Sequence, residues 1–279
     1  MKLFKVDGAV LLQTSSALYR LENQDWNVLV NQENLYNFLE GYASNHAPIE
    51  STVDGEKIEA PIGSQEIWAA GVTYLRSKEA RMDEAKESGA ADFYAKVYEA
   101  KRPEIFFKST AARSAGPDQE VMIRRDSHWN VPEPELTLFA NAAGKIVGYT
   151  IGNDMSSRDI EGENPLYLPQ AKCYERSAAI GPCLLVTPKP IDADTQIHMS
   201  IERNKEIVFS GSISINQMKR KHDELISYLF MEMDFPQGVY LMTGTCLVPP
   251  NDFTLAVDDL VHISIDGIGS LRNRVAIKQ

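Results

Sequence analysis

The sequence predicts a mixed α+β fold, dominated by antiparallel β-sheet, with a small N-terminal α+β domain ahead of a larger sheet-rich domain. Two patterns support this prediction. From about Arg102 onward, short apolar or alternating stretches follow one another, separated by Gly- and Asn-rich turns. Strongly helical composition is confined to earlier segments. With 279 residues, of which 43% are hydrophobic, the chain can bury a sizeable core.

Residues 1–60 are predicted to form the small N-terminal domain. "MKLFKVDGAVLLQTSSALYRLE" is typical of short strands joined at a Gly turn, and "NQENLYNFLEGYA" predicts one short helix that ends at Gly41. The stretch "APIGSQEIWAAGVTY" then leads into a buried strand ending near Tyr74. We therefore expect the second domain to span residues 61–279.

The second domain is expected to begin with a helical cover and continue as sheet. "SKEARMDEAKESGAADFYAKVYEA", from Ser77 to Ala100, has helical composition interrupted near Gly89, and its charge suits a solvated helix or a lid over a bound ligand. "GKIVGYTIGND" predicts a strand preceded by the hairpin turn "ANAAG". "VHISIDGIGSLRNRVAI" alternates, with Val261, Ile263 and Ile265 on one face.

Charge and composition exclude several classes of function. The formal net charge of −11 argues against a nucleic-acid or anionic-membrane surface, because binding to phosphates needs a basic footprint. Three cysteines without CxxC spacing suggest neither a disulfide framework nor a zinc site. The longest apolar run, "AAIGPCLLV", is too short to span a bilayer, and "MKLFKVDGAVLL" lacks a signal-peptide cleavage pattern. A cytoplasmic protein is expected.

The stretch "NVPEPELTLF" places two acids where they should repel each other. In a strand, Glu133 and Glu135 share one face, while Leu136 and Leu138 occupy the other. If the following hairpin turns near Ala142, Glu133 lies opposite about Gly152, and Asp154 comes within a residue or two of that pair. Three converging carboxylates suit Mg²⁺ or Mn²⁺. The alternative interpretation is a set of ordinary exposed acids at strand ends.

Several motifs occur in an order that resembles the fumarylacetoacetate hydrolase superfamily, from about Gly71 to Val275. These are "PEIFFKST", "EPELTLF", "GYTIGNDMSSRD", "LPQAKCYERSAAIGP", "GVYLMTGT" and "IDGIGSLRNRV". The resemblance implies an antiparallel sheet roll or sandwich of that family's C-terminal type, and an assembly of two or four copies. It also implies a site in which Mg²⁺ is held by Glu133, Glu135 and Asp154, with Lys172 at the metal and Thr245 contacting substrate.

The resemblance leaves two reactions open. Family members that hydrolyse carbon–carbon bonds generally carry a histidine on a lid segment, whereas Ser77–Ala100 contains none. His128 could approach the site from elsewhere, although a surface position suits it better. "GVTYLRSKEAR", "RPEIFFKSTAARSAGP" and "NVPEPELTLF" are similar to the 2-keto-3-deoxy-D-arabinonate dehydratases of the superfamily. That similarity implies substrate contacts by Arg76 and Ser77, and a role beside the metal for Glu104.

The expected chemistry is dehydration of a 2-keto-3-deoxy sugar acid to 2,5-dioxopentanoate. A 2-oxo acid chelates the metal, which acidifies the C3 protons and stabilises the enolate. Glu104 is the expected base, and Lys172 either donates a hydrogen bond or, less favoured beside three acids, forms a Schiff base. Surface roles for Arg76 and Glu104 and a structural role for Lys172 are the alternatives. The rival functions are a hydrolase of a carbon–carbon bond in a diketo acid, and a family scaffold that keeps metal binding but serves as a partner-binding module.

Overall fold

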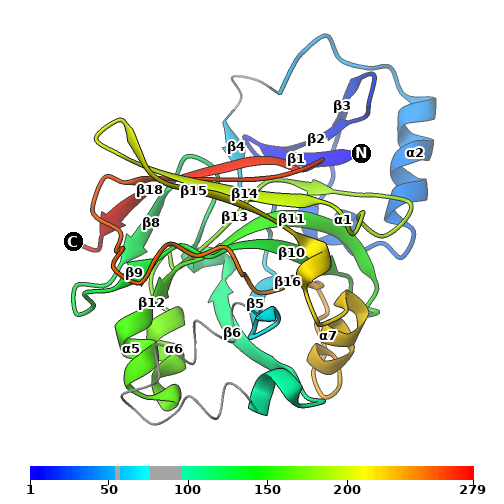
Figure 1. The fold of residues 1–279 in the computed structure, drawn as a ribbon. Coiled ribbons are helices and arrows are strands. Elements are labelled where there is room, and N and C mark those ends of the chain that lie inside the picture. The colour runs from blue at the N-terminus through cyan, green and yellow to red at the C-terminus, as the bar shows by residue number, and fades with distance from the viewer. Residues whose placement is uncertain (54–56, 76–95) are drawn as a thin grey trace.

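The computed structural model describes residues 1–53, 57–75 and 96–279 (Figure 1). Among these residues, one sheet of 11 strands forms the centre of the molecule. Its main path runs in the order β3 (Leu18–Leu21), β2 (Ala9–Gln13), β1 (Lys2–Val6), β13 (Ala178–Leu185), β11 (Ile146–Asp154), β10 (Pro134–Ala140), β16 (Val239–Met242), β5 (Glu66–Gly71) and β6 (Glu104–Thr110). The short strands β4 (Ile58–Glu59) and β7 (Ser114–Ala115) pair with β1 and β13.

A second sheet packs on the first. It has five strands among the described residues, in the order β15 (Glu206–Ser214), β14 (Gln196–Arg203), β17 (Leu260–Ile265), β18 (Gly269–Ile277) and β8 (Glu120–Ile123). Strands β13, β10 and β11 of the first sheet contact β18, β14 and β17 of the second. A separate two-stranded ladder joins β9 (Asn130–Val131) to β12 (Ser156–Ser157). Most pairs are antiparallel, so the predicted sheet-dominated α+β fold is confirmed.

The helices lie outside the sheets (Figure 1). Those described are α1 (Trp26–Val30), α2 (Leu35–Asn45), α5 (Arg158–Glu163), α6 (Leu168–Lys172) and α7 (His222–Leu229), with 3₁₀ turns at Ala111–Arg113, Pro165–Tyr167 and Ile215–Gln217. Residues 96–99 are also helical, but most of the predicted Ser77–Ala100 cover, including Gly89, lies outside the described residues. Among those described, no helix is long and apolar enough to cross a bilayer.

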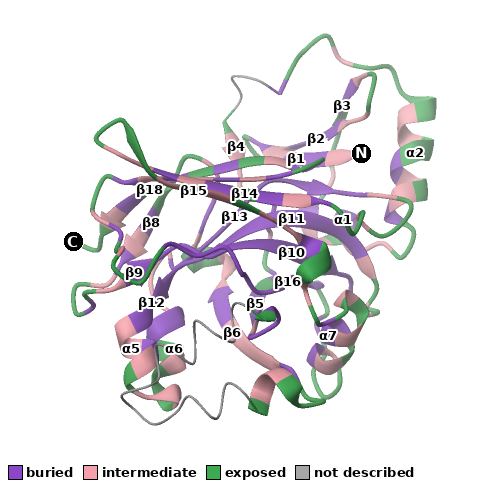
Figure 2. Ribbon diagram, viewed as in Figure 1, coloured by how far each residue is buried: buried purple, intermediate pink, exposed green. Residues whose placement is uncertain are grey.

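The sandwich is held together by the alternating faces of its strands. Val261, Ile263 and Ile265 of β17 are all buried, as their spacing predicted. They pack in one cluster with Leu136 and Leu138 of β10. Figure 2 shows this distribution: the strands are buried along the middle of the molecule, and exposed residues gather in the loops and outer helices. The buried apolar side chains make the two-sheet core the main source of stability.

The N-terminal strands continue the large sheet. β1 pairs with β2 on one side and with β13 on the other, through Leu3 opposite Leu184. The domain boundary at residue 60 stays a prediction. The predicted end of the helix at Gly41 is wrong, because α2 runs through it to Asn45. Burial of Leu35 and Leu39 on the inner face outweighs the cost of one helical glycine, about 1 kcal/mol.

The register of the β10–β11 hairpin decides which acidic residues lie next to one another. Its turn closes at Asn141–Lys145, where Gly144 has a φ of +72°, a conformation that favours glycine. The turn therefore lies later than expected, and Glu135, rather than Glu133, is opposite Gly152. As a result Asp154 lies beside Glu133, and its backbone N–H donates to the Glu133 carbonyl over 2.9 Å.

Candidate metal centre

Three carboxylates meet at the end of the β10–β11 hairpin. Glu135 lies in β10, Glu133 is the residue just before that strand, and Asp154 is the last residue of β11. One oxygen from each lies within 4.8 Å of the others, and the three residues are at most 4% exposed. Within the described residues this is the one cluster of acids, histidines or cysteines that could hold a metal ion. Burial excludes the alternative of exposed strand-end acids.

The electrostatics of the cluster favour a bound cation. Burial, together with the negative charges of Asp154 and Glu133, raises the pKa of Glu135 well above its usual value. The Gly244 backbone N–H donates to Glu135 over 2.6 Å and opposes that shift. Burial also acts against ionisation of Asp154, but the positive charges of two lysines lower its pKa. A divalent ion between the oxygens would relieve the remaining repulsion, and an all-oxygen donor set suits Mg²⁺.

Lys172 lies among the predicted ligands. It ends α6 and is fully buried. Its Nζ donates to Glu133 Oε2 over 2.7 Å, to Asp154 Oδ2 over 3.2 Å and to Ser156 Oγ over 2.5 Å. The resemblance implied a lysine at this place, and the structure brings Lys172 together with the acids; its role at a metal stays a prediction. Two adjacent carboxylates stabilise its ammonium form, which has no free electron pair for attack on a carbonyl group.

Two further cations of the site were missed from the sequence. Arg158, at the start of α5, donates to Glu133 Oε1 over 2.9 Å. Lys108, in β6, lies 2.5 Å from Asp154 Oδ1. Both residues stand inside the quoted motifs "NDMSSRD" and "PEIFFKST". A signal for Lys108 did exist, because a lysine within an apolar strand is buried only when it is paired.

A pocket opens over the three acids. Its lining combines the uncharged residues Gly71, Val72, Phe106 and Thr245 with five charged residues, Glu133, Glu135, Asp154, Arg158 and Lys172. Thr245, the predicted substrate contact, therefore reaches the pocket, and its Oγ1 accepts a hydrogen bond from the Leu247 N–H over 3.2 Å. The described lining includes no histidine.

Glu104 stands behind the pocket wall. It is the first residue of β6 and pairs with Gly71 of β5. A methyl group at Gly71 would overlap the Glu104 carboxyl group, so the carboxyl group lies directly against a pocket-lining residue. The other predicted substrate contacts, Arg76 and Ser77, lie outside the described residues.

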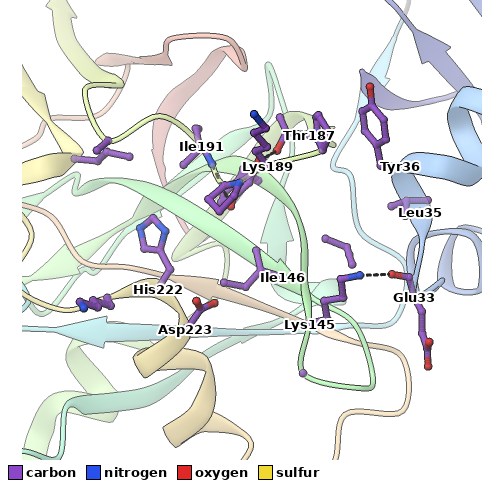
Figure 3. Close-up of a pocket in the computed structure, with 18 of the residues that line it drawn as sticks. Glu33, Leu35, Tyr36, Lys145, Ile146, Thr187, Lys189, Ile191, His222 and Asp223 are labelled. Carbon is purple, nitrogen blue, oxygen red and sulfur yellow. Dashed lines mark hydrogen bonds between the residues drawn. The ribbon is translucent and has the colours of Figure 1, made fainter.

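A larger hollow of about 770 Å³ lies elsewhere, between the N-terminal end of α2, the β10–β11 turn and the N-terminal end of α7. Figure 3 shows Lys145, Lys189, His222 and Asp223 around it. Glu33 and Asp223 are the carboxylates in its described lining. The Glu33 backbone carbonyl accepts a hydrogen bond from Lys145. Size alone therefore does not identify the reactive site, and the converging acids do.

Comparison with known proteins agrees with this geometry. Residues 66–276 match the model of the fumarylacetoacetate (FAA) hydrolase C-terminal family, so the chain belongs to that family. Two of the similar proteins within this family are named as sugar-acid dehydratases. The chain is 48% identical over 217 residues to the probable 2-keto-3-deoxyxylonate dehydratase of Haloferax volcanii, covering 77% of this chain and 73% of that protein. It is 43% identical over 220 residues, with the same coverage, to the 2-dehydro-3-deoxy-D-arabinonate dehydratase of Saccharolobus solfataricus.

A solved structure shares the whole architecture. It is 2-keto-3-deoxy-D-arabinonate dehydratase complexed with magnesium and 2,5-dioxopentanoate, with a TM-score of 0.82, 34% identity and full coverage of both chains. The predicted family resemblance is thus confirmed, at both the broad and the narrow level.

Proposed function

We propose that this protein is a Mg²⁺-dependent dehydratase that converts a 2-keto-3-deoxypentonate, of the 2-dehydro-3-deoxy-D-arabinonate type, into 2,5-dioxopentanoate. The observation that carries the proposal is the buried set of Glu133, Glu135 and Asp154 with Lys172 in direct contact with two of them. The names of the relatives, and the magnesium and 2,5-dioxopentanoate in the solved structure, support the same reaction.

The residues divide the reaction between them. Mg²⁺ held by the three acids would supply a Lewis acid that polarises a chelating 2-oxo acid and acidifies its C3 protons. Glu104 accepts a C3 proton from the side of Gly71. The C4 hydroxyl group leaves as water, and proton shifts along the remaining chain produce the C5 aldehyde. Water is the one molecule lost, so the product has two hydrogens and one oxygen fewer than the substrate.

The remaining side chains bind and orient. Lys172 lines the pocket, and its three N–H groups donate to Glu133, Asp154 and Ser156. When substrate binds, one of these bonds is exchanged for a hydrogen bond to the substrate carboxylate or to the departing hydroxyl group. Thr245, which also lines the pocket, contacts the substrate. We assign Arg76 and Ser77 to the substrate as well, on family likeness.

The hydrolase alternative receives less support. Hydrolysis of a carbon–carbon bond needs a base that activates water, which the family supplies from a histidine. The described lining of the pocket contains none, and His128 is an exposed residue whose backbone N–H is bound to Asp159. An inactive scaffold has no need of a lysine buried against the ligands, because burying an ammonium group costs free energy that a useful contact must repay.

The test is direct turnover. Purified protein with Mg²⁺ and 2-keto-3-deoxy-D-arabinonate should form the dioxo acid, detected as a semialdehyde, and a chelator should stop the reaction. Glu104→Gln should bind the metal normally and lose turnover, whereas Glu206→Gln, at the exposed start of β15, serves as the matched control. Turnover by Glu104→Gln at the wild-type rate would remove Glu104 from the role of base.

We further propose a cytoplasmic homodimer or homotetramer. The three cysteines are free thiols, as expected in a reducing compartment. β15 ends the five-stranded sheet and exposes Ile207 and Val208, which are 59% and 42% accessible, so this edge is available to a second copy. Sedimentation analysis of the purified protein tests the assembly.

A further inference from the structure

Lys108 is buried beneath the metal site without reaching the pocket. It is 1% exposed and takes no part in the described pocket lining. An ammonium group has three N–H donors, and all three have acceptors here. They are Asp154 Oδ1 at 2.5 Å, the Met155 carbonyl at 2.9 Å and the Lys172 carbonyl at 2.5 Å. Lys108 therefore does not line the pocket, but it contacts Asp154 and Lys172, which do.

The acceptors belong to two different elements. Asp154 and Met155 end and follow β11, and Lys172 ends α6. The Lys108 side chain, from β6, thus connects the end of β11, which carries Asp154, with the end of α6, which carries Lys172. Because Lys172 reaches Glu133 and Asp154 from that helix end, its position relative to the ligands depends on this connection.

The contact with Asp154 has a second consequence. Lys108 occupies Oδ1, whereas Oδ2 is the oxygen on the side of Lys172 and Glu133. Oδ2 also accepts a hydrogen bond from Lys172, but over the longer distance of 3.2 Å, so Oδ2 is the oxygen that a cation would take while Oδ1 stays with Lys108 at 2.5 Å. Mg²⁺ takes six ligands, so three carboxylates that give one oxygen each leave about three positions. A 2-oxo acid needs two of them, for its carboxylate and its 2-oxo group.

We propose that Lys108 is a positioning residue that restricts Asp154 to one metal-binding oxygen and fixes the backbone of Lys172, so that coordination positions stay available for the substrate. This inference rests on the proposed metal site and deepens it. Burial of an unpaired ammonium group is costly, and the three contacts compensate for that cost only in the observed arrangement. A lysine that served folding alone would not need to select one of the two Asp154 oxygens.

The test counts water molecules on bound Mn²⁺ by proton relaxation, in the absence of substrate. The wild-type complex should carry about three exchangeable waters, and pyruvate should displace about two of them. Lys108→Met should lose one water, as Asp154 turns to bind through both oxygens. It should also lose roughly 10- to 100-fold in metal affinity or kcat/KM, the usual effect of removing a partner of a ligand. Lys108→Arg, which keeps the charge and its donors, should restore the count.

Lys5→Met is the matched control, since Lys5 is also a strand lysine with an acidic partner, Glu59 at 3.7 Å, but lies in β1 away from the site. It should retain about three waters. Should Lys108→Met not fold, Lys108→Gln takes its place, because its amide removes the charge and keeps a donor. Two waters or fewer on the wild-type protein, or a folded neutral variant that matches Lys5→Met in water count and metal affinity, would overturn the proposal. Because no substrate turnover enters the count, failure of the dehydratase assay gives a separate result.

Discussion

Replacing Gly71 by alanine should separate metal binding from proton abstraction. A Cβ at Gly71 would lie 2.7 Å from the Glu104 carboxyl carbon, whereas carbon atoms in contact are about 3.5–4.0 Å apart. The Glu104 carboxyl group must therefore move by about 1 Å. A displacement of about that size at a reacting group can lower the rate about 100-fold. We expect Gly71→Ala to lose about 100-fold in kcat and to keep the metal affinity set by Glu133, Glu135 and Asp154.

The assay is semialdehyde formation at saturating Mg²⁺, with Mn²⁺ binding measured separately on the same preparations. Gly41→Ala is the control, because a Cβ there meets nothing within 4 Å on an exposed face of α2. It should keep full activity and gain about 0.5–1 kcal/mol of stability. If Gly71→Ala lowers kcat by displacing Glu104, the double variant Gly71→Ala/Glu104→Gln should have the same kcat as Glu104→Gln alone. A Gly71→Ala enzyme with wild-type kcat would refute the placement of the base.

Three further predictions concern pH and stability. Because the pKa of Glu135 is raised by burial and by its acidic neighbours, part of the metal-free protein holds a proton there, and metal must displace it. Metal affinity should therefore fall as the pH is lowered, with proton release measurable by calorimetry in buffers of different ionisation enthalpy, and Glu135→Gln should show no release from this site. Burial lowers the pKa of His222 below 6.5, so the unfolded chain binds the extra proton and the free energy of unfolding should fall as the pH drops below about 6.5. His222→Asn should lose that part of the pH dependence in urea titrations, and an unchanged slope would contradict it. Leu138→Ala in the fully buried core should cost about 2–5 kcal/mol in the same titrations.

The sequence was most informative where chemistry and local periodicity coincide. Glu133 and Glu135 were predicted to share a face because they lie two residues apart, and the structure brings them together beside Asp154. Their buried negative charge is partly offset by contacts with Lys172 and Arg158. The register was less well predicted, because a turn can close at several residues and Gly144 moved it later. The predicted helix end at Gly41 was wrong for a similar reason. The low helix propensity of glycine was outweighed by the packing of the rest of α2.

Residues that act through distant parts of the chain were harder to find. The role of Lys108 depends on the Lys172 carbonyl, 64 positions later, and no spacing rule links them. Arg158 could be seen in a motif, but its direction toward Glu133 follows from α5 starting beside the β9–β12 ladder. Such contacts are decided by tertiary packing, which the order of residues alone does not display.

The strand order also bears on how this enzyme could be altered. The proposed metal ligands lie in or next to β10 and β11, which have partners on both sides, whereas Glu104 lies on β6, the last strand of the same path. Substitutions on β5 and β6 that leave Lys108 unchanged can thus alter the reactive side of the pocket with little disturbance to β10 and β11. Libraries for directed evolution toward other 2-oxo acids would best begin at that margin, where new activities can be sampled while the ion stays in place.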